Sequence, residues 1–334
     1  MLIRDVTIVG AGPAGLAAGI AAKRFGLDYS IIEKGVLVNS IYKFPVGMVF
    51  FTTPELLEIG GLPLVSPFEK PTRLEALKYY RRVVDTYNLP IDFGEQVVSV
   101  EKEQTGVFAL ETRSDKGVRR LRHSRNVIFA IGYFDHPNFL GVPGENLPHV
   151  AHYYNESHGF YRKHVVIVGG GNSAAETALE LFRSGARVTL VHRHAELKPS
   201  IKYWVRPDIE NRIKEGSVKG HFNTRLMEIQ PSHVIVERDG AREEIPADAV
   251  FLLTGYHPDC DLYRRAGIRL HRDTMAPELS KETFETNVPG LFLAGGAICG
   301  RDTSNIFIEN GRFHGETIVG VVAQRLGKHE AMRG

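Results

Sequence analysis

Short apolar runs that end at glycine recur along this chain and predict its strands. The run at residues 6–9 leads into a glycine-rich segment at 10–15, and the run at 165–168 leads into another at 169–171. Apolar runs of this length, bounded by turn residues, are typical of strands buried on both faces of a parallel sheet. Helices must cover those faces, so the pattern predicts an α/β protein with two Rossmann-like dinucleotide-binding domains.

The pattern changes twice between these two segments. Apolar residues recur at helical spacing over residues 72–88 and predict an amphipathic helix. Strands of a small antiparallel layer are predicted at 97–102, 108–112 and 118–123, with a hairpin turn at 114–117.

The first glycine-rich segment has the spacing of a dinucleotide-binding loop. It contains Gly10, Gly12 and Gly15, and small residues that let a helix pack closely on a sheet follow it. Such a loop presents backbone N–H groups and a helix N-terminus to a pyrophosphate. Glu33 ends the next predicted strand, where a carboxylate accepts a hydrogen bond from a ribose 2′-hydroxyl. The first site is therefore predicted to bind an unphosphorylated adenosine, as in FAD or NAD.

The second segment has the same design but is followed by a different strand end. The apolar run at 187–191 ends in His192 and Arg193 rather than in an acid, and Lys198 follows. Cations here favour a 2′-phosphate, so the second site is predicted to bind NADPH; the alternative is a solvated basic strand end. The predicted NADPH contacts are Gly169, Gly171, Asn172, Ser173, Ala174, Glu176, His192, Arg193, Lys198 and Gly255.

Two strands that end in glycine and precede a proline bracket the second segment. The first is at 127–132 and the second at 250–255. We interpret them as the two crossings between domains. The predicted first domain is therefore discontinuous, 1–134 with 256–334, and the predicted second domain, 135–255, is inserted into it. The crossings are also candidate hinges for domain rotation.

A further glycine-ended strand at 286–296 and the segment 304–315 complete a familiar order of motifs. The order of these motifs, over nearly the whole chain, resembles that of two-dinucleotide flavoproteins of the thioredoxin reductase type. The resemblance implies that a helix beginning near Asn305–Ile306 points its N-terminus at the flavin. Two departures separate the chain from thioredoxin reductases. Tyr154 and Ser157 hold the positions of the Cys-x-x-Cys pair, and the closing strand ends Gly295-Gly296 rather than Gly-Asp.

Two longer strings, 202–216 and 306–315, are similar to the bacillithiol disulfide reductase family. The resemblance implies an NADPH-dependent enzyme that passes electrons through FAD to a low-molecular-weight disulfide. Ala14 stands where family members carry a proposed active cysteine. The predicted FAD contacts are Gly10, Gly12, Pro13, Ala14, Gly15, Glu33, Lys34, Asn39, Ser40, Val98, Gly132, Gly295 and Ile306.

No catalytic residue is assigned from the sequence. The weak candidates are Cys299, His314 and His152, and each has a simpler interpretation as a packed side chain. A lone cysteine, Cys260, is expected to be buried, and Trp204 to pack in a core or an interface. Two other functions stay open: a ferredoxin- or flavodoxin-NADP reductase, which the basic run 119–125 could serve as a docking surface, and a flavin-bound redox sensor.

Composition and charge exclude several classes of partner and cofactor. The net charge of +2 gives no electrostatic reason to expect a nucleic-acid or membrane-surface partner. No apolar stretch approaches the roughly 20 residues that span a bilayer. The 14 histidines show no ligand spacing, so no metal is predicted. We expect a cytoplasmic homodimer or higher homo-oligomer without a signal peptide.

Overall fold

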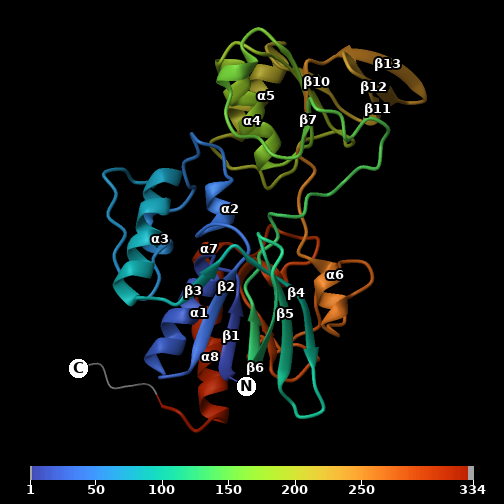
Figure 1. Cartoon of the computed structure of the whole chain (residues 1–334). Helices are drawn as coiled ribbons and strands as arrows, with labels where there is room; N and C mark the ends of the chain where they lie inside the picture. The colour runs from blue at the N-terminus through green and yellow to red at the C-terminus, as the bar shows by residue number, and fades with distance from the viewer. Residues whose placement is uncertain (1, 330–334) are drawn as a thin grey trace. The chain divides into compact units, whose positions relative to one another are not determined.

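The structure is a computed structural model of the whole chain, and it describes residues 2–329. The chain divides into two compact units, one made of residues up to His136 together with those from Tyr256 onward, the other of Pro137–Gly255. In Figure 1 the first unit runs in colour from blue to green and again from orange to red, and the second unit runs from green through yellow to orange. The first limit lies two residues beyond the predicted one, at 136 rather than 134.

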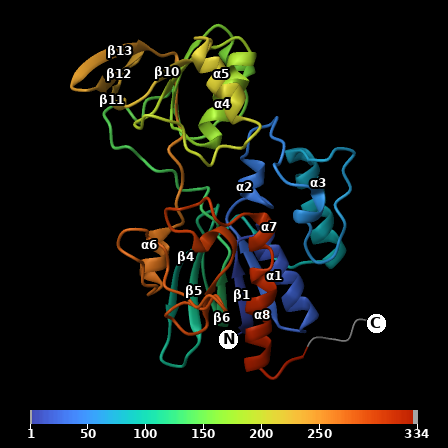
Figure 2. The same cartoon turned by 180° about the vertical axis from the view of Figure 1, so that it is seen from behind.

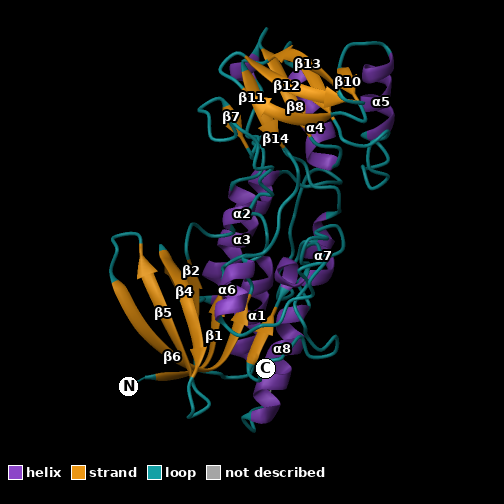
Figure 3. Cartoon of the chain, turned by 90° about the vertical axis from the view of Figure 1, so that its right-hand side faces the viewer, coloured by secondary structure: helices purple, strands orange, loops and turns teal. Residues whose placement is uncertain are grey.

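The first unit is built on a sheet that is parallel in one part and antiparallel in another. Its strand order is β3-β2-β1-β6-β5-β4, and β15 pairs with β6. β1, β2, β3 and β15 run parallel to their neighbours, whereas β4 and β5 run antiparallel to theirs (Figure 3). The bounds are β1 (Ile3–Val9), β2 (Tyr29–Glu33), β3 (Ile91–Phe93), β4 (Glu95–Lys102), β5 (Phe108–Ser114), β6 (Arg119–Phe129) and β15 (Leu291–Leu293).

One long strand replaces two predicted ones. The predicted strands 118–123 and 127–132 are both parts of β6, which ends at Phe129. Residues 119–124 pair with β5 and residues 123–129 pair with β1, so β6 belongs to both the antiparallel layer and the parallel sheet. Neither glycine nor proline interrupts residues 124–126, the stretch between the two predicted strands, and the strand continues while its neighbours change.

The first unit has six α-helices among residues 2–329. Their bounds are α1 (Pro13–Arg24), α2 (Asn39–Tyr42), α3 (Arg73–Tyr87), α6 (Cys260–Arg265), α7 (Ile308–Gly311) and α8 (His314–Arg325). α3 begins at a capping box in which Thr72 and Glu75 bond each other's backbone N–H, close to the predicted start at 72. The closing helix predicted near Asn305–Ile306 instead begins at Ile308, because Asn310 Oδ1 accepts from the Phe307 N–H at 2.9 Å and caps it there.

Helices α1 and α8 lie side by side (Figure 2). A Cβ on Gly315 would lie 2.5 Å from the Ala18 nitrogen, so only glycine allows this approach. Since α1 starts at the end of the first glycine-rich loop, α8 supports the helix that carries that loop.

The second unit repeats the parallel design. Its five-stranded parallel sheet has the order β10-β9-β8-β14-β7, and a three-stranded antiparallel sheet has the order β11-β12-β13. The strands are β7 (Val150–Ala151), β8 (His164–Val168), β9 (Arg187–Val191), β10 (Lys219–His221), β11 (Arg225–Ile229), β12 (His233–Arg238), β13 (Ala241–Pro246) and β14 (Ala249–Leu252). The helices are α4 (Asn172–Arg183) and α5 (Arg206–Lys214).

Each parallel sheet is buried on both faces, as its apolar runs predict. In the first unit Ile8 and Ile128 pack on one face, and Val9 and Phe129 pack on the other. In the second unit Val165 and Val166 separate in the same way. The predicted α/β class, with two Rossmann-like domains and small antiparallel layers, is confirmed. Among residues 2–329 no helix is long and apolar enough to cross a membrane.

Candidate functional site

The first glycine-rich loop follows β1 and leaves room for a ligand. Gly10 has φ +109°, and a Cβ there would lie 2.5 Å from the Ala130 carbonyl oxygen. A Cβ on Gly15 would lie 1.9 Å from the Gly10 oxygen, so this glycine packs α1 against the loop. By contrast, no atom lies within 4 Å of a Cβ built on Gly12. Two glycines therefore serve packing, and Gly12 keeps open the space where a phosphate would meet the loop.

This loop borders a cavity that collects most of the predicted FAD contacts. Two predicted residues do not line it: Gly15, which is buried behind the loop, and Val98, whose place is taken by its neighbour Val97. A bulge in the pairing of β4 with β5 falls between Val97 and Ser99, which explains why the alternation expected from the sequence is shifted there. The predicted residues that line the cavity are Gly10, Gly12, Pro13, Ala14, Glu33, Lys34, Asn39, Ser40, Gly132, Gly295 and Ile306.

Glu33 is held in place at the end of β2. Its Oε2 accepts a hydrogen bond from the Ala11 N–H and its Oε1 accepts one from the Gly35 N–H, both at 2.8 Å. Burial raises the pKa of Glu33, against these two hydrogen bonds, which act to lower it. The carboxylate is thus fixed beside the loop, where it can also accept from a ribose hydroxyl.

Asp135 is a cavity residue that the sequence analysis missed. It accepts from Lys43 Nζ at 2.7 Å and lies 2.9 Å from Lys34 Nζ. Although burial acts to raise it, the bonds and charges of these two lysines leave the pKa of Asp135 lowered. Lys34 is therefore bound to Asp135, which ties the end of β2 to the segment that follows β6.

The cysteines do not offer a reactive thiol to this cavity. Burial raises the pKa of Cys299 to about 11, and Cys299 is not among the residues that line the cavity. Cys260 is buried at the start of α6, and burial raises its pKa as well. A thiol nucleophile acts as its thiolate, and both of these thiols are protonated at neutral pH.

His314 supports the cavity from behind. Its Nδ1 accepts from the Gly295 N–H at 3.1 Å, and its ring stacks on Phe284 with the centroids 4.1 Å apart. Burial lowers the pKa of His314, so the ring is neutral at pH 7. His152 belongs to the second unit, 3.5 Å from Glu145 Oε1. Within the described residues, neither histidine lines the cavity.

The second glycine-rich loop, between β8 and α4, also has one open glycine. A Cβ on Gly169 would lie 2.5 Å from the Leu253 oxygen, and one on Gly170 would lie 2.2 Å from the His192 ring. A Cβ on Gly171 would have only Lys198 Cδ near it, at 3.9 Å. Gly171 therefore corresponds to Gly12 of the first loop.

His192 differs from its predicted role as a cation. Its side chain is buried beneath Gly170, and burial, together with the nearby His194, Arg193 and Lys198, lowers its pKa. A neutral ring cannot supply charge to a 2′-phosphate. Arg193 and Lys198 are both exposed, and they are the cations that remain for this role.

A strap formed by residues 198–202 lies over the second loop. The Lys198 N–H donates to the Gly170 oxygen at 2.9 Å. Asn172 holds the strap from both sides, because its Nδ2 donates to the Ser200 oxygen at 3.1 Å and its Oδ1 accepts from the Lys202 N–H at 2.8 Å. Glu176 pairs with Lys202 Nζ at 2.6 Å, so it supports the strap. Ser173 is exposed at the start of α4, and Ala174 is buried.

The two predicted crossings are hydrogen-bonded to each other. The Asn138 N–H donates to the Gly255 oxygen at 2.9 Å, and Thr254 Oγ1 donates to the Asn138 oxygen at 2.7 Å. The His257 N–H donates to the His136 oxygen at 2.9 Å. Gly255, with φ +94°, therefore serves the crossing as a backbone turn.

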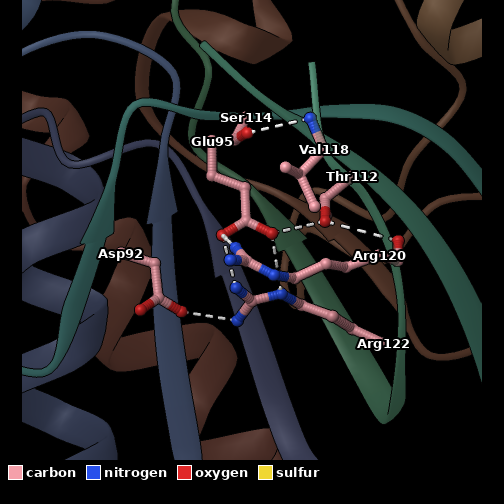
Figure 4. A network of polar contacts seen from close by, with 7 residues as sticks. All are labelled: Asp92, Glu95, Thr112, Ser114, Val118, Arg120 and Arg122. Atoms are coloured by element: carbon pink, nitrogen blue, oxygen red, sulfur yellow. Dashed lines mark hydrogen bonds and ion pairs between the residues drawn. The ribbon is translucent and has the colours of Figure 1, made fainter. Parts of the chain in front are cut away.

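The basic run 119–125 is neutralised by acidic partners. Arg119 pairs with Glu111, and Arg125 lies 3.9 Å from Asp5. Arg120 and Arg122 both pair with Glu95, as Figure 4 shows. Charges paired within the molecule leave a weaker field for an acidic partner, which weakens the argument for a ferredoxin docking surface at this run.

The remaining sequence candidates fall in the second unit. Trp204 is 40% exposed and its neighbour Tyr203 is 80% exposed, so Trp204 is not packed in the core of this unit. Packing in an interface stays a prediction. Tyr154, which holds one position of the missing cysteine pair, is buried. No group of three potential metal ligands occurs among residues 2–329.

Both loops fit their predicted dinucleotides. Each has an open glycine at the N-terminus of a helix, as a pyrophosphate requires. Beside the first loop lies a fixed carboxylate, Glu33, which suits an unphosphorylated ribose; beside the second lie Arg193 and Lys198, which suit a 2′-phosphate.

Comparison with known proteins bears on the same assignment. Residues 7–295 match the family model of pyridine nucleotide-disulphide oxidoreductases. The chain is 42% identical over 327 residues to bacilliredoxin reductase Bdr of Bacillus subtilis, covering 97% of this chain and 99% of that protein. The structure is similar to bacillithiol disulfide reductase Bdr from Bacillus cereus, with a TM-score of 0.95 and 39% identity over 97% of this chain and all of that chain.

More distant relatives agree on the fold. A ferredoxin–NADP reductase of Ignicoccus hospitalis is 27% identical over 88% of this chain and 90% of its own length. Thioredoxin reductase of T. acidophilum shares the fold, with a TM-score of 0.75 and 23% identity over 97% of this chain and 98% of that chain. The predicted thioredoxin reductase-like architecture and the predicted cofactors, FAD and NADPH, are confirmed. The protein is an NADPH-dependent flavoprotein oxidoreductase, and the chain belongs to the pyridine nucleotide-disulphide oxidoreductase family, in its bacillithiol disulfide reductase branch.

Proposed function

We propose that the protein transfers electrons from NADPH, through FAD, to a low-molecular-weight disulfide of the bacillithiol disulfide type. The observation that carries this proposal is the 39% identity over 97% of the chain to a protein named for that activity. The net reaction consumes one NADPH and one proton, cleaves one S–S bond and releases two thiols. When bound, the two cofactors supply the hydride chemistry, and the chain supplies binding and orientation.

The cavity residues support a disulfide reduction without a protein cysteine. Ala14 lines the cavity at the loop, where a thiol is absent. Cys299, with a pKa of about 11, is a protonated thiol outside the lining. We therefore propose that the disulfide is reduced within this cavity, without a protein cysteine as an intermediate carrier of the electrons.

Each loop is proposed to hold one dinucleotide. In the first unit Gly12 opens the loop to the FAD pyrophosphate, and Glu33 accepts from the adenosine ribose. In the second unit Gly171 opens the loop to NADPH, and Arg193 and Lys198 bind its 2′-phosphate.

Valine at the two open glycines tests this assignment. Gly12 has φ −78° and Gly171 has φ −105°, so a side chain strains neither backbone and fills only the ligand space. Gly12→Val is expected to weaken FAD binding at least tenfold and leave NADPH binding unchanged, and Gly171→Val to do the reverse. Gly159→Val, at another glycine with no atom within 4 Å, is the control. Loss of both ligands in either variant, or of neither, would contradict the assignment.

The acceptor is tested by reoxidation of the reduced enzyme. We expect rapid reduction by NADPH in stopped flow, followed by reoxidation with bacillithiol disulfide. Turnover with ferredoxin and with no disulfide would favour the electron transferase instead. Reduction by NADPH too slow to support turnover would favour a redox sensor.

We also propose that the protein works in the cytoplasm as a homo-oligomer. Large apolar side chains are exposed on the first unit, among them Val65 at 84% and Phe68 at 63%. Surfaces of this kind favour association. Light scattering on the purified protein should give a multiple of the 37.2 kDa chain mass, and a mass equal to one chain would overturn the proposal.

A further inference from the structure

Two arginines of the basic run 119–125, Arg120 and Arg122, pair with one buried carboxylate, that of Glu95. Glu95 begins β4, and its side chain is only 4% exposed. It accepts from Arg122 Nη2 at 2.5 Å and Nε at 3.2 Å, and from Arg120 Nη1 at 3.1 Å. Thr112 Oγ1 donates to the same carboxylate at 2.5 Å. Figure 4 shows these donors from β5 and β6 converging on Glu95.

Arg122 also joins the two sides of a sharp corner. The chain leaves the parallel sheet at the end of β3 and enters the antiparallel layer at β4, turning at Gly94 with φ +64°. Arg122 Nη1 donates to Asp92 at 2.5 Å on one side of this glycine, and the same guanidinium binds Glu95 on the other. The Gly94 oxygen accepts from the Asp115 N–H at 2.9 Å. The corner is therefore held by a forked cation and by one backbone hydrogen bond.

This corner begins a wall of the cavity described above. The first three residues of β4, Glu95, Gln96 and Val97, line the same cavity as Glu33 and Gly12. Without Arg122, the buried Glu95 carboxylate would keep only Thr112 and Arg120, whose side chain is 54% exposed. A buried charge that loses most of its compensation is drawn toward water. If Glu95 moves, the start of β4 moves with it, and the cavity wall beside Glu33 changes shape.

We propose that Arg122, assisted by Arg120, is a positioning residue for FAD. The two arginines hold the Gly94 corner, and through it the wall that meets the adenosine end of the cofactor. The inference rests on the proposed placement of FAD in this cavity. It gives the two inner arginines of the basic run an internal role that the sequence analysis did not anticipate.

The test compares two arginines of one strand. Arg122→Met keeps the aliphatic stem and removes the fork, whereas the control, Arg119→Met, removes a pair with Glu111 in which the Arg119 side chain is 72% exposed. Full-length protein stripped of flavin is titrated with FAD, followed by flavin fluorescence, and ADP is used as a competitor. We expect Arg122→Met to weaken both FAD and ADP at least tenfold, and Arg119→Met to stay within twofold of wild type. The FAD and ADP affinities of Arg120→Met should lie between those of Arg122→Met and Arg119→Met, because Glu95 is still paired with Arg122 in that variant.

Two further measurements keep the outcome decisive. NADPH binding and far-UV circular dichroism must match wild type, which shows that the variant is folded. If Arg122→Met does not fold, Arg122→Lys and Arg120→Met carry the test, with an expected loss of threefold or more in FAD affinity. FAD affinity of the Arg122 variants within twofold of Arg119→Met would overturn the proposal. Failure of ADP to compete with FAD in the wild type would instead refute the placement of FAD in the cavity.

Discussion

Two glycines of α8 should respond in opposite directions to the same substitution. A Cβ on Gly320 would have no atom within 4 Å, whereas one on Gly315 would lie 2.5 Å from the Ala18 nitrogen and 2.7 Å from its Cα. Alanine in a helix interior is favoured over glycine by about 1 kcal/mol, so Gly320→Ala should stabilise the first unit by about that amount. At Gly315, in the first turn, the gain is smaller, and forcing α8 from α1 costs about 1–3 kcal/mol.

The two units can be followed separately in one unfolding experiment. Trp204 is the single tryptophan and lies in the second unit, so its fluorescence reports that unit. Release of bound FAD reports the first unit. For a unit of this size, 1 kcal/mol corresponds to about 2–4 °C in Tm.

Thermal release of FAD should therefore rise by about 2–4 °C in Gly320→Ala and fall in Gly315→Ala. Because α1 begins at the first loop, Gly315→Ala should also weaken FAD binding, whereas Gly320→Ala should not. The Trp204 transition should stay in place in both variants. Equal or greater stability of Gly315→Ala would refute the argument from the helix contact.

Four other outcomes are expected. Arg193→Ala should reduce the preference for NADPH over NADH by about ten- to a hundredfold, measured by affinity, because a charge-assisted bond is lost; an unchanged preference counts against it. Asn172→Ala frees the strap and should raise the KM for NADPH with kcat unchanged, and an unaltered KM contradicts this role. Cys299→Ser should keep turnover within twofold. Ala14→Cys places a thiol in the lining of the cavity and should speed reoxidation by bacillithiol disulfide in stopped flow; an unchanged rate contradicts this expectation.

The glycine-rich loops show what local pattern predicts well. Gly12, Gly171 and Glu33 were identified because loop, helix start and strand end depend on residues close in sequence. Asp135 escaped because its partner Lys43 lies 92 positions away. No local signal marks such a pair, although an acid directly after a glycine-ended strand would have been a reason to examine it.

His192 and the basic run 119–125 show the opposite failure, in which residue type suggests a charge that the fold removes. His192 is a cation by composition, but the chain buries it under Gly170 and burial keeps it neutral. Arg120 and Arg122 resemble a solvated basic surface, but both bind Glu95. Ionisation and pairing depend on solvent and on distant neighbours, so sequence pattern cannot supply them.

The sequence by itself determined the α/β class, the two dinucleotide loops and the strands that lead into them, because apolar periodicity and glycine spacing act over a few residues. The tertiary structure decided which cations are available, which thiols are protonated, and that the Gly94 corner is held by Arg122. Those properties depend on burial and on partners far apart in the sequence, which meet only when the chain is folded. The Gly94 corner, for example, lies where β3, β4 and β6 meet.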